Sequence, residues 1–218
     1  MICTYLGRLA FCCPLLTFCF YYWVRFLLPV AYFLFLLQVG GQDSPDVAKS
    51  YGNIGLVYDS QGQYEQALEN HQKALEIFIK VSGQDHLDVA KTRENMAITY
   101  DQQGHYDQAL EIYKSVLETK IRVCGHEHPD VAASYNGIAN VYLATGDLEN
   151  ALVQHQKALE IRTRVFGSDH LDVAASYNNI GEVYRNQGKY EEALEYYQKD
   201  LDITVRLVGQ NRPLLTVQ

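Results

Sequence analysis

The sequence DVAASYNNIGEVYRNQGKYEEALEYYQKDLDITVRLVG, residues 172–209, decides the fold of this chain. Its first part, residues 172–188, places apolar and small side chains three or four positions apart, as an amphipathic helix does. Gly188 then predicts the end of that helix, because glycine readily adopts the left-handed backbone that often follows a helix. The second part, residues 190–209, repeats the helical spacing, and Gly209 is expected to end it. The stretch therefore predicts two consecutive helices joined by a short turn.

The two-helix unit occurs four times, because the chain aligns with itself when it is shifted by 42 residues. A fixed period of this length is the signature of a repeat array. One helix pair cannot bury both of its apolar faces, so stacked pairs share a continuous core and form a superhelix with a concave and a convex wall. Four columns of residues carry the period: Asp46, Asp88, Asp130 and Asp172, each followed by Val-Ala; Tyr58, Tyr100, Tyr142 and Tyr184; Gly62, Gly104, Gly146 and Gly188; and Ala67, Ala109, Ala151 and Ala193, each followed by Leu.

The period also sets the expected boundaries of the repeats. We expect a domain over residues 43–212 with units at about 44–86, 87–128, 129–170 and 171–212, followed by the stub of a fifth unit at 213–218. The last complete unit lacks a polar capping helix, which leaves an apolar end face. Either the protein self-associates through this uncapped C-terminal repeat, or the chain is a fragment of a longer array.

Small residues recur where the two helices of a unit are expected to pack. Gly55 and Gly181 occupy the same place in the first helix of their units, and the other two units have alanine there. These positions predict a close approach of the second helix. A larger side chain would overpack the pair, at a cost of about 1–3 kcal/mol.

The motifs of the unit resemble the tetratricopeptide repeat. The resemblance rests on Tyr-x-x-Ile-Gly-x-x-Tyr at 177–184, then Gly-x-Tyr, then two Ala-Leu pairs, of which Ala158-Leu159 is one example of the second. The 42-residue period, with a His-Pro-Asp-Val-Ala junction at 128–132, is similar to the kinesin light chain type of this repeat. Over residues 44–212 the resemblance implies an all-α solenoid of four helix-turn-helix units that binds peptide or protein segments in its concave groove.

The same resemblance stops at the N-terminus. Kinesin light chains carry a heptad coiled coil before their repeats, which binds the motor heavy chain, whereas this chain has an apolar tract in that place. The resemblance therefore implies the repeat fold and peptide recognition, and a non-catalytic scaffold is the leading hypothesis. A cargo adaptor like the kinesin light chains is the alternative.

Residues 9–39 form a largely apolar tract whose one charged residue is Arg25. A membrane-spanning helix needs about 20 apolar residues, so the whole tract is long enough, although each half alone is short. We expect the segment 1–42 to form an apolar N-terminal helix that anchors the protein to a membrane. A cleaved signal peptide, a re-entrant hairpin and a start foreign to the natural domain stay open as alternatives. The repeats lack a glycosylation sequon and a disulfide pair, which favours a cytosolic repeat domain.

A column of asparagines is the main candidate for ligand binding. Asn53, Asn95 and Asn179 occupy the same place in the first helices of units one, two and four, and Gly137 replaces them in unit three. Asparagine is a poor residue for a helix interior, so a repeated one needs some compensation. An amide can donate and accept, so these side chains could bind the backbone of an extended peptide. The alternative is an internal ladder in which each Asn bonds the backbone of the neighbouring repeat.

Other polar residues extend this candidate site. Lys49 and Lys91 each lie four residues before an asparagine of the column, so each pair shares a helix face. This spacing suggests a clamp for a carboxylate, and ordinary surface lysines are the alternative. Units three and four have alanine in place of lysine, and their candidate residues are polar but mostly uncharged: Asn136, Asn140 and Arg185.

The stretch GHEHPDVA, residues 125–132, has the composition of a metal site but falls short of one. A structural zinc site needs about four converging ligands, and here the acids recur in every repeat. We expect a joint between repeats instead, with His128 at the N-cap of the following helix and Pro129 in its first turn. Asp130 then lies at the positive end of the helix dipole.

Composition and motifs exclude several functions. The net charge is −8, and all 26 acidic residues follow residue 42, which argues against binding of nucleic acid. The sequence has no phosphate-binding loop, no metalloprotease motif and no nucleophile motif, so we expect neither enzymatic activity nor a cofactor. Proteins or peptides are the expected partners.

Overall fold

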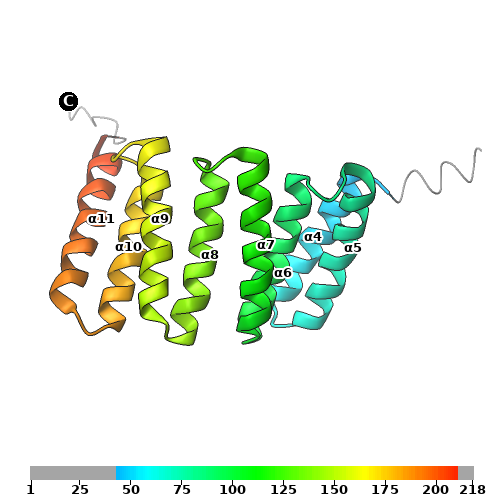
Figure 1. The fold of residues 1–218 in the computed structure, drawn as a ribbon, viewed down its shortest axis with the longest axis horizontal. Coiled ribbons are helices and arrows are strands. Elements are labelled where there is room, and N and C mark those ends of the chain that lie inside the picture. The colour runs from blue at the N-terminus through cyan, green and yellow to red at the C-terminus, as the bar shows by residue number, and fades with distance from the viewer. Residues whose placement is uncertain (1–42, 211–218) are drawn as a thin grey trace, which may run out of the picture. The chain divides into compact units, whose positions relative to one another are not determined.

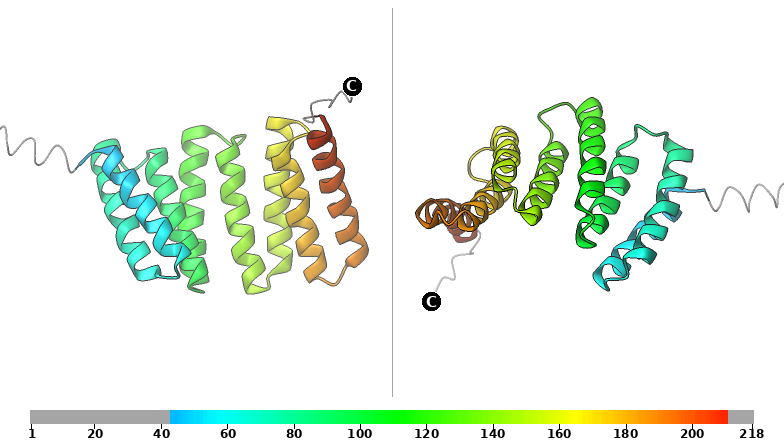
Figure 2. Two further views of the ribbon diagram at one scale, coloured as in Figure 1. Left: turned by 180° about the vertical axis from the view of Figure 1, so that it is seen from behind. Right: turned by 60° about the horizontal axis from the view of Figure 1, so that its bottom comes forward.

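The computed structural model describes residues 43–210, and these residues contain only helices and the turns that join them. The helices stand side by side in chain order, and the array beginning at Ala48 forms one compact unit (Figures 1 and 2). The helices are α4 (Pro45–Ser60), α5 (Tyr64–Ser82), α6 (Leu87–Gln102), α7 (Tyr106–Cys124), α8 (Pro129–Thr145), α9 (Leu148–Phe166), α10 (Leu171–Asn186) and α11 (Tyr190–Gln210).

The helices are organised as four helix-turn-helix repeats: α4–α5, α6–α7, α8–α9 and α10–α11. From α5 to α11 each helix contacts the next one along the chain, so neighbouring repeats pack on each other as well as internally. The helices α6 and α8 also contact each other directly. The first helices of the repeats therefore form one wall of the array, which we call the first-helix wall. The predicted all-α solenoid is confirmed.

Histidines begin three of the first helices. His86, His128 and His170 are the N-cap residues of α6, α8 and α10, and each ring nitrogen Nδ1 accepts a hydrogen bond from the backbone N–H two residues on, at 3.1–3.2 Å. Pro129 follows in the first turn of α8, where a missing N–H leaves no bond unmade. The predicted role of the 125–132 stretch as a joint is confirmed.

Glycines end three of the second helices, but not the fourth. Gly83, Gly125 and Gly167 follow α5, α7 and α9 with φ between 81° and 85°, a backbone that favours glycine. Gly209 was expected to end α11 in the same way, and this prediction is wrong, because α11 continues through Gly209 to Gln210. The other three glycines each lie in a turn that leads to the first helix of the next repeat. The described part of the chain ends before any such helix after α11.

Close packing within a repeat depends on small residues. A Cβ atom on Gly55 would lie 2.6 Å from Cε1 of His71, and one on Gly181 would lie 2.9 Å from Cε1 of Tyr197. Aromatic rings of the second helix thus rest directly on the backbone of the first. The column of alanines on the second helices is also buried: Ala67, Ala109, Ala151 and Ala193. The predicted close approach is confirmed.

Both ends of the chain lie outside the described residues. The apolar tract 9–39, predicted to be a membrane anchor, and the expected stub 213–218 both fall there. Within residues 43–210, no helix combines the length and the apolar character that a membrane crossing requires.

Substitution of Gly55 by alanine tests the close approach of α4 and α5. Gly55→Ala should lower the free energy of unfolding by about 1–3 kcal/mol, because the new methyl group collides with the fully buried His71 ring. Gly52→Ala in the same helix is the matched control, since nothing lies within 4 Å of its Cβ position. That control should stabilise the protein by about 0.5–1 kcal/mol. Urea denaturation measures both, and equal effects would contradict the packing account.

Candidate functional site

The first-helix wall contains a cavity of about 450 Å³ between α6 and α8. We call it the α6–α8 groove. Second helices contribute only Tyr113 and Arg162 to its lining, so its chemistry comes mainly from first helices. Its lining residues are Glu94, Ile98, Asp101, Tyr113, Ala133, Asn136, Gly137, Asn140 and Arg162.

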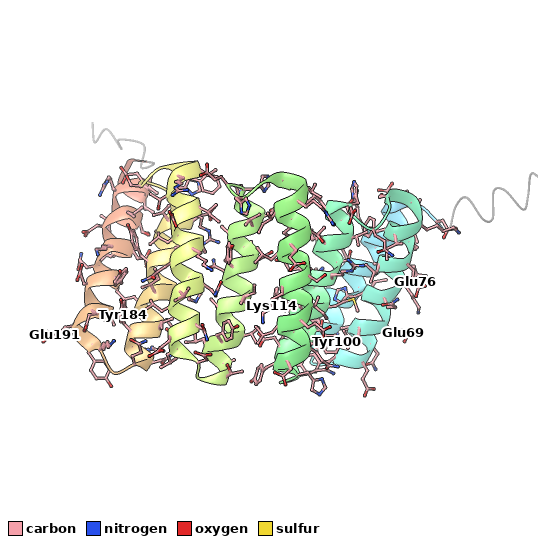
Figure 3. All side chains as sticks on the ribbon, in the orientation of Figure 1. Glu69, Glu76, Tyr100, Lys114, Tyr184 and Glu191 are labelled. Carbon is pink, nitrogen blue, oxygen red and sulfur yellow. The ribbon has the colours of Figure 1, made fainter. Side chains whose placement is uncertain are left out.

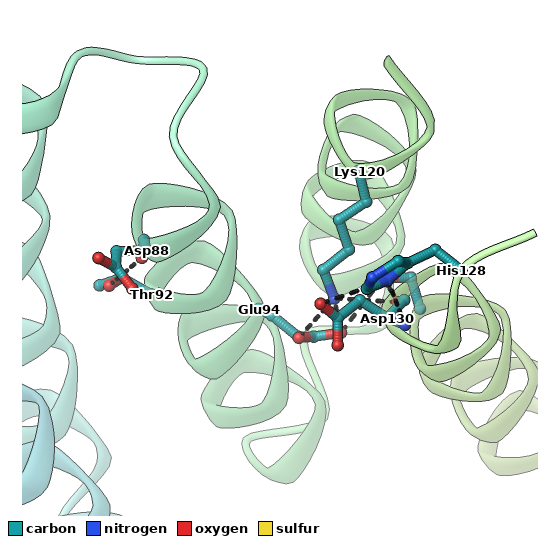
Figure 4. Close-up of polar contacts among 7 residues, drawn as sticks. Asp88, Thr92, Glu94, Lys120, His128 and Asp130 are labelled. Carbon is teal, nitrogen blue, oxygen red and sulfur yellow. Dashed lines mark hydrogen bonds and ion pairs between the residues drawn. The ribbon is translucent and has the colours of Figure 1, made fainter. Parts of the chain in front are cut away.

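Glu94, which lines this groove, forms an ion pair with the buried Lys120 (Figure 4). The ammonium of Lys120 on α7, 5% exposed, donates to both carboxylate oxygens of Glu94 on α6, at 2.8 and 2.9 Å. It also donates to the backbone carbonyl of Asp130 on α8 at 3.2 Å, and the hydroxyl of Ser134 donates to Glu94. The pair therefore joins three helices from two repeats. Removing either partner would leave a buried charge uncompensated, which typically costs about 3–5 kcal/mol.

A second polar network lies one repeat further on. The amide of Asn136 lies between Arg162 and His155, and it satisfies both when its oxygen accepts from the guanidinium at 2.9 Å and its nitrogen donates to Nδ1 of His155 at 3.0 Å. Arg162 also donates to the backbone carbonyl of Asp172 and to the hydroxyl of Ser176 on α10. Arg162 thus occupies the place that Lys120 has in the preceding repeat.

Burial sets the protonation of this second network. Desolvation, followed by the positive charge of Arg162, lowers the pKa of His155 from its ordinary value to about 4. The ring is only 1% exposed and accepts the Asn136 bond on Nδ1, as a neutral imidazole can. Burial also lowers the pKa of Arg162, and the carboxylate of Asp172 opposes that shift.

Asp101 is an acidic residue of the groove with an unsatisfied hydrogen-bond acceptor. Its Oδ1 atom is buried and lacks a hydrogen-bond partner among the described residues. Burial raises the pKa of its carboxyl group. Burial, aided by the negative charges of Glu94 and Asp101, likewise raises the pKa of Tyr113. A buried acceptor without a donor is energetically costly.

The predicted site residues are spread over all four first helices. The α6–α8 groove brings together Asn136 and Asn140, but the Asn136 amide is already used inside the protein. Asn53 is exposed on α4, and Asn95 and Asn179 are half-buried on α6 and α10. Within residues 43–210 these three amides make no hydrogen bond through their side chains, so the internal ladder weighed as an alternative is not formed there.

The predicted cationic residues lie outside the groove. Lys49 and Lys91 are exposed on α4 and α6, and Arg185 is exposed on α10, where it pairs with Glu182 one turn earlier. The clamp suggested for Lys49 and Lys91 remains a prediction.

The sequence interpretation missed the buried cations near the groove, of which Arg162 lines it and Lys120 pairs with its lining residue Glu94. Lys120 and Arg162 share one column of the repeat, in which unit one has Phe78 and unit four has Thr204. A cation in a column that elsewhere holds an uncharged residue was the available signal. Glu94, the partner of Lys120, is aligned with Gly52 of the first unit. The Lys120–Glu94 ion pair can therefore be found in the sequence only by comparing two columns together.

The opposite wall has a second, more apolar hollow of about 380 Å³ between α5, α6 and α7. Tyr100, Met96, Leu75 and Ile112 supply its apolar lining, and Arg93 and Glu111 add charge. Figure 3 labels Tyr100 of this lining, and Glu69 and Glu76 on α5. Glu69 pairs with Lys73 at 2.6 Å on the same helix, as solvated surface charges do.

The stretch 125–132 does not gather a metal-ligand set. Glu127 forms an ion pair with Arg164 at 2.9 Å, and His128 caps α8. Throughout residues 43–210, three or more His, Cys, Asp or Glu side chains never converge as metal ligands would. Exposed pairs equivalent to Glu127–Arg164 join Asp85 to Arg122 and Asp169 to Arg206.

The neutral form of His155 should make stability depend on pH. Its folded-state pKa of about 4 lies below the ordinary value near 6.5. Its contribution is therefore complete above pH 6.5 and is lost as the pH falls towards 4, where the unfolded chain takes up the proton first. We expect a loss of up to about 3 kcal/mol over this window.

His155→Gln removes the titrating group and should flatten the pH dependence of unfolding between pH 6.5 and 4. Urea denaturation of both proteins at several pH values measures the difference. Parallel stability curves for the two proteins would show that His155 already titrates normally in the folded state.

Comparisons with known proteins agree with this architecture. The sequence model of the tetratricopeptide repeat matches residues 37–79, 46–122, 107–154 and 130–204. The structure of BtubC (BKLC) from P. vanneervenii superposes with a TM-score of 0.67 at 26% identity, over 80% of this chain and 70% of that one. A kinesin light chain-like protein of Podosopora anserina with nearly identical TPR-like repeats gives 0.62 at 22% identity, over 78% of this chain and 79% of its own.

A search of curated proteins finds no significant match. The matched segments together span residues 37–204, which covers most of the described repeats. The chain therefore belongs to the tetratricopeptide repeat family.

Proposed function

We propose that the protein is a non-catalytic scaffold that binds an extended peptide or protein segment along its first-helix wall. Repeats of this family generally bind proteins or peptides. The observation that carries the proposal is the α6–α8 groove, where the buried Oδ1 of Asp101 lacks a donor. Its volume of about 450 Å³ suits a few side chains and a stretch of backbone.

The asparagine column extends the proposed contact beyond the groove. Asn53, Asn95 and Asn179 lie at intervals of one or two repeats and keep their amides unengaged within the described residues. Each amide can donate to a peptide carbonyl and accept from a peptide N–H, whatever the side chain of the ligand is. Gly137 leaves a gap in the column beside the groove, and Asn140 and Asp101 supply polar atoms there.

The first two repeats favour an acidic ligand segment. Lys49 and Lys91 lie on the same helix faces as Asn53 and Asn95 and add positive charge to that half of the wall. A carboxylate-bearing peptide would therefore place its acidic part over α4 and α6 and its neutral part over α8 and α10.

Removal of the asparagine amides should weaken peptide binding. Peptides selected on the wild-type protein from a library of short random sequences serve as the probe. Asn95→Ala and Asn179→Ala should each raise the dissociation constant about tenfold, because each loses a paired hydrogen bond. Calorimetric titration measures this, and Glu111→Ala on the opposite wall is the matched control.

Charge reversal tests the acidic half separately. Lys49→Glu and Lys91→Glu should weaken acidic peptides and leave neutral ones unchanged. Unchanged affinity for acidic peptides would disprove the lysine clamp, whereas unchanged affinity in the asparagine variants would disprove the groove proposal itself.

A cargo-adaptor role is the second candidate, favoured by the likeness of the repeats to those of kinesin light chain-type proteins. Co-purification of the full-length protein with a kinesin heavy chain tests it, and recovery without the heavy chain would rule it out. The heptad coiled coil that binds the heavy chain in that family is replaced in this sequence by the apolar tract.

Membrane tethering through residues 9–39 is a further part of the proposal, and it rests on the sequence alone. Fractionation of cells expressing the full chain should place it with membranes, with the repeats accessible to protease from the cytosolic side. A chain starting at residue 43 should move to the soluble fraction. Full-length protein in the soluble fraction would contradict the anchor.

A further inference from the structure

The helix α4 exposes a face whose equivalents on α8 and α10, the first helices of repeats three and four, are buried. On α4, Ser50 is exposed, and Ile54 and Val57 are 45% and 57% exposed. The equivalent residues of the third and fourth repeats are at most 3% exposed, because the preceding second helix covers them. These residues are Ser134, Ile138 and Val141 on α8, and Ser176, Ile180 and Val183 on α10.

The last helix exposes the opposite half of the same contact. Five large residues form a stripe along α11 at helical spacing and are 52–68% exposed. Their equivalents on α9 are all at least half-covered, since α10 packs there. The stripe consists of Tyr190, Leu194, Leu201, Val205 and Val208, equivalent to Leu148, Leu152, Leu159, Thr163 and Phe166.

The two exposed faces match in chemistry as well as in position. The residues that α4 exposes, Ser-Ile-Val, are identical to those that α8 and α10 bury. Leu194 and Leu201 likewise repeat Leu110 and Leu117 of α7, which pack in one cluster with Ile138 and Val141 of α8. The chain therefore carries both halves of a junction that it already forms internally between α7 and α8.

We propose that a second copy of this chain covers these faces, with α11 of one molecule packed on α4 of the next as α7 packs on α8. This contact is heterologous, so it joins molecules head to tail and continues the first-helix wall from one copy to the next. One such junction covers both apolar faces. A two-fold pairing of α11 with itself would cover only the stripe, and it would bring together the acidic residues Glu191 and Glu195 that flank it. The proposal rests on the repeat packing and is independent of peptide binding.

Two complementary variants test the junction. The tail variant carries Leu194→Glu and Leu201→Glu, and the head variant carries Ile54→Glu and Val57→Glu. Sedimentation of the full-length proteins in a density-matched nonionic detergent should show concentration-dependent association for the wild type. Each variant alone should stay monomeric, with the dissociation constant of the junction raised at least about 100-fold. A mixture of the two should form a one-to-one dimer, since it retains one intact tail and one intact head.

Val153→Glu is the matched control. Val153 is 44% exposed on α9 away from both faces, and the other three repeats have glutamate at its place: Glu69, Glu111 and Glu195. This variant should associate like the wild type. Circular dichroism checks that every variant is folded. If the head or the tail variant does not fold, Ser50→Arg replaces the head variant and Val205→Glu replaces the tail variant.

Three results would overturn the proposal. The wild type could remain monomeric at all concentrations, or its association could be unaffected by the tail and head variants. The head variant could also still dimerise alone while the tail variant does not, which would show a two-fold contact of α11 with α11.

Discussion

The array depends on one recurring contact, in which the first helix of each repeat covers the apolar stripe on the second helix of the repeat before it. Leu110 and Leu117 on α7, packed with Ile138 and Val141 on α8, show the contact in its apolar form. Since one helix pair cannot bury both faces, the stability of such an array is close to a sum of repeat and junction contributions. A change in a junction therefore changes the positions of the first helices and, with them, the shape of the first-helix wall.

Two of the junctions place a charge inside this contact. Lys120 and Arg162 each donate to a backbone carbonyl and lie beside a serine hydroxyl on the first helix of the next repeat, Ser134 and Ser176 respectively. A buried ion pair is weak evidence for stability, because desolvation offsets much of the attraction. Each cation is satisfied by a group at one place on a first helix: Glu94 accepts from Lys120, and Asn136 accepts from Arg162. Arg162 and the carboxylate partner of Lys120, Glu94, also line the α6–α8 groove, so the junction and the candidate site share residues.

Much of the fold could be predicted from the sequence, because its period aligns residues that share one environment. The helix pairs, the histidine caps and the close approach at Gly55 all follow from single columns of identical or similar residues. The end of α11 was wrongly predicted, because the helix continues through Gly209 to Gln210. The candidate site was only partly predictable. Asn136 was read as a ligand residue, but Arg162 and His155 occupy its amide, and this contact joins different columns.

The central claim is that a junction tolerates a buried cation only because the neighbouring helices supply its partners. A double-mutant cycle on Lys120→Phe and Glu94→Gly, which together install the residues of the first repeat, Phe78 and Gly52, tests it most directly. Urea denaturation should show that Glu94→Gly alone costs about 3 kcal/mol, because Lys120 is left uncompensated, and that the double variant costs less than either single one. Additive effects of the two substitutions would contradict the account.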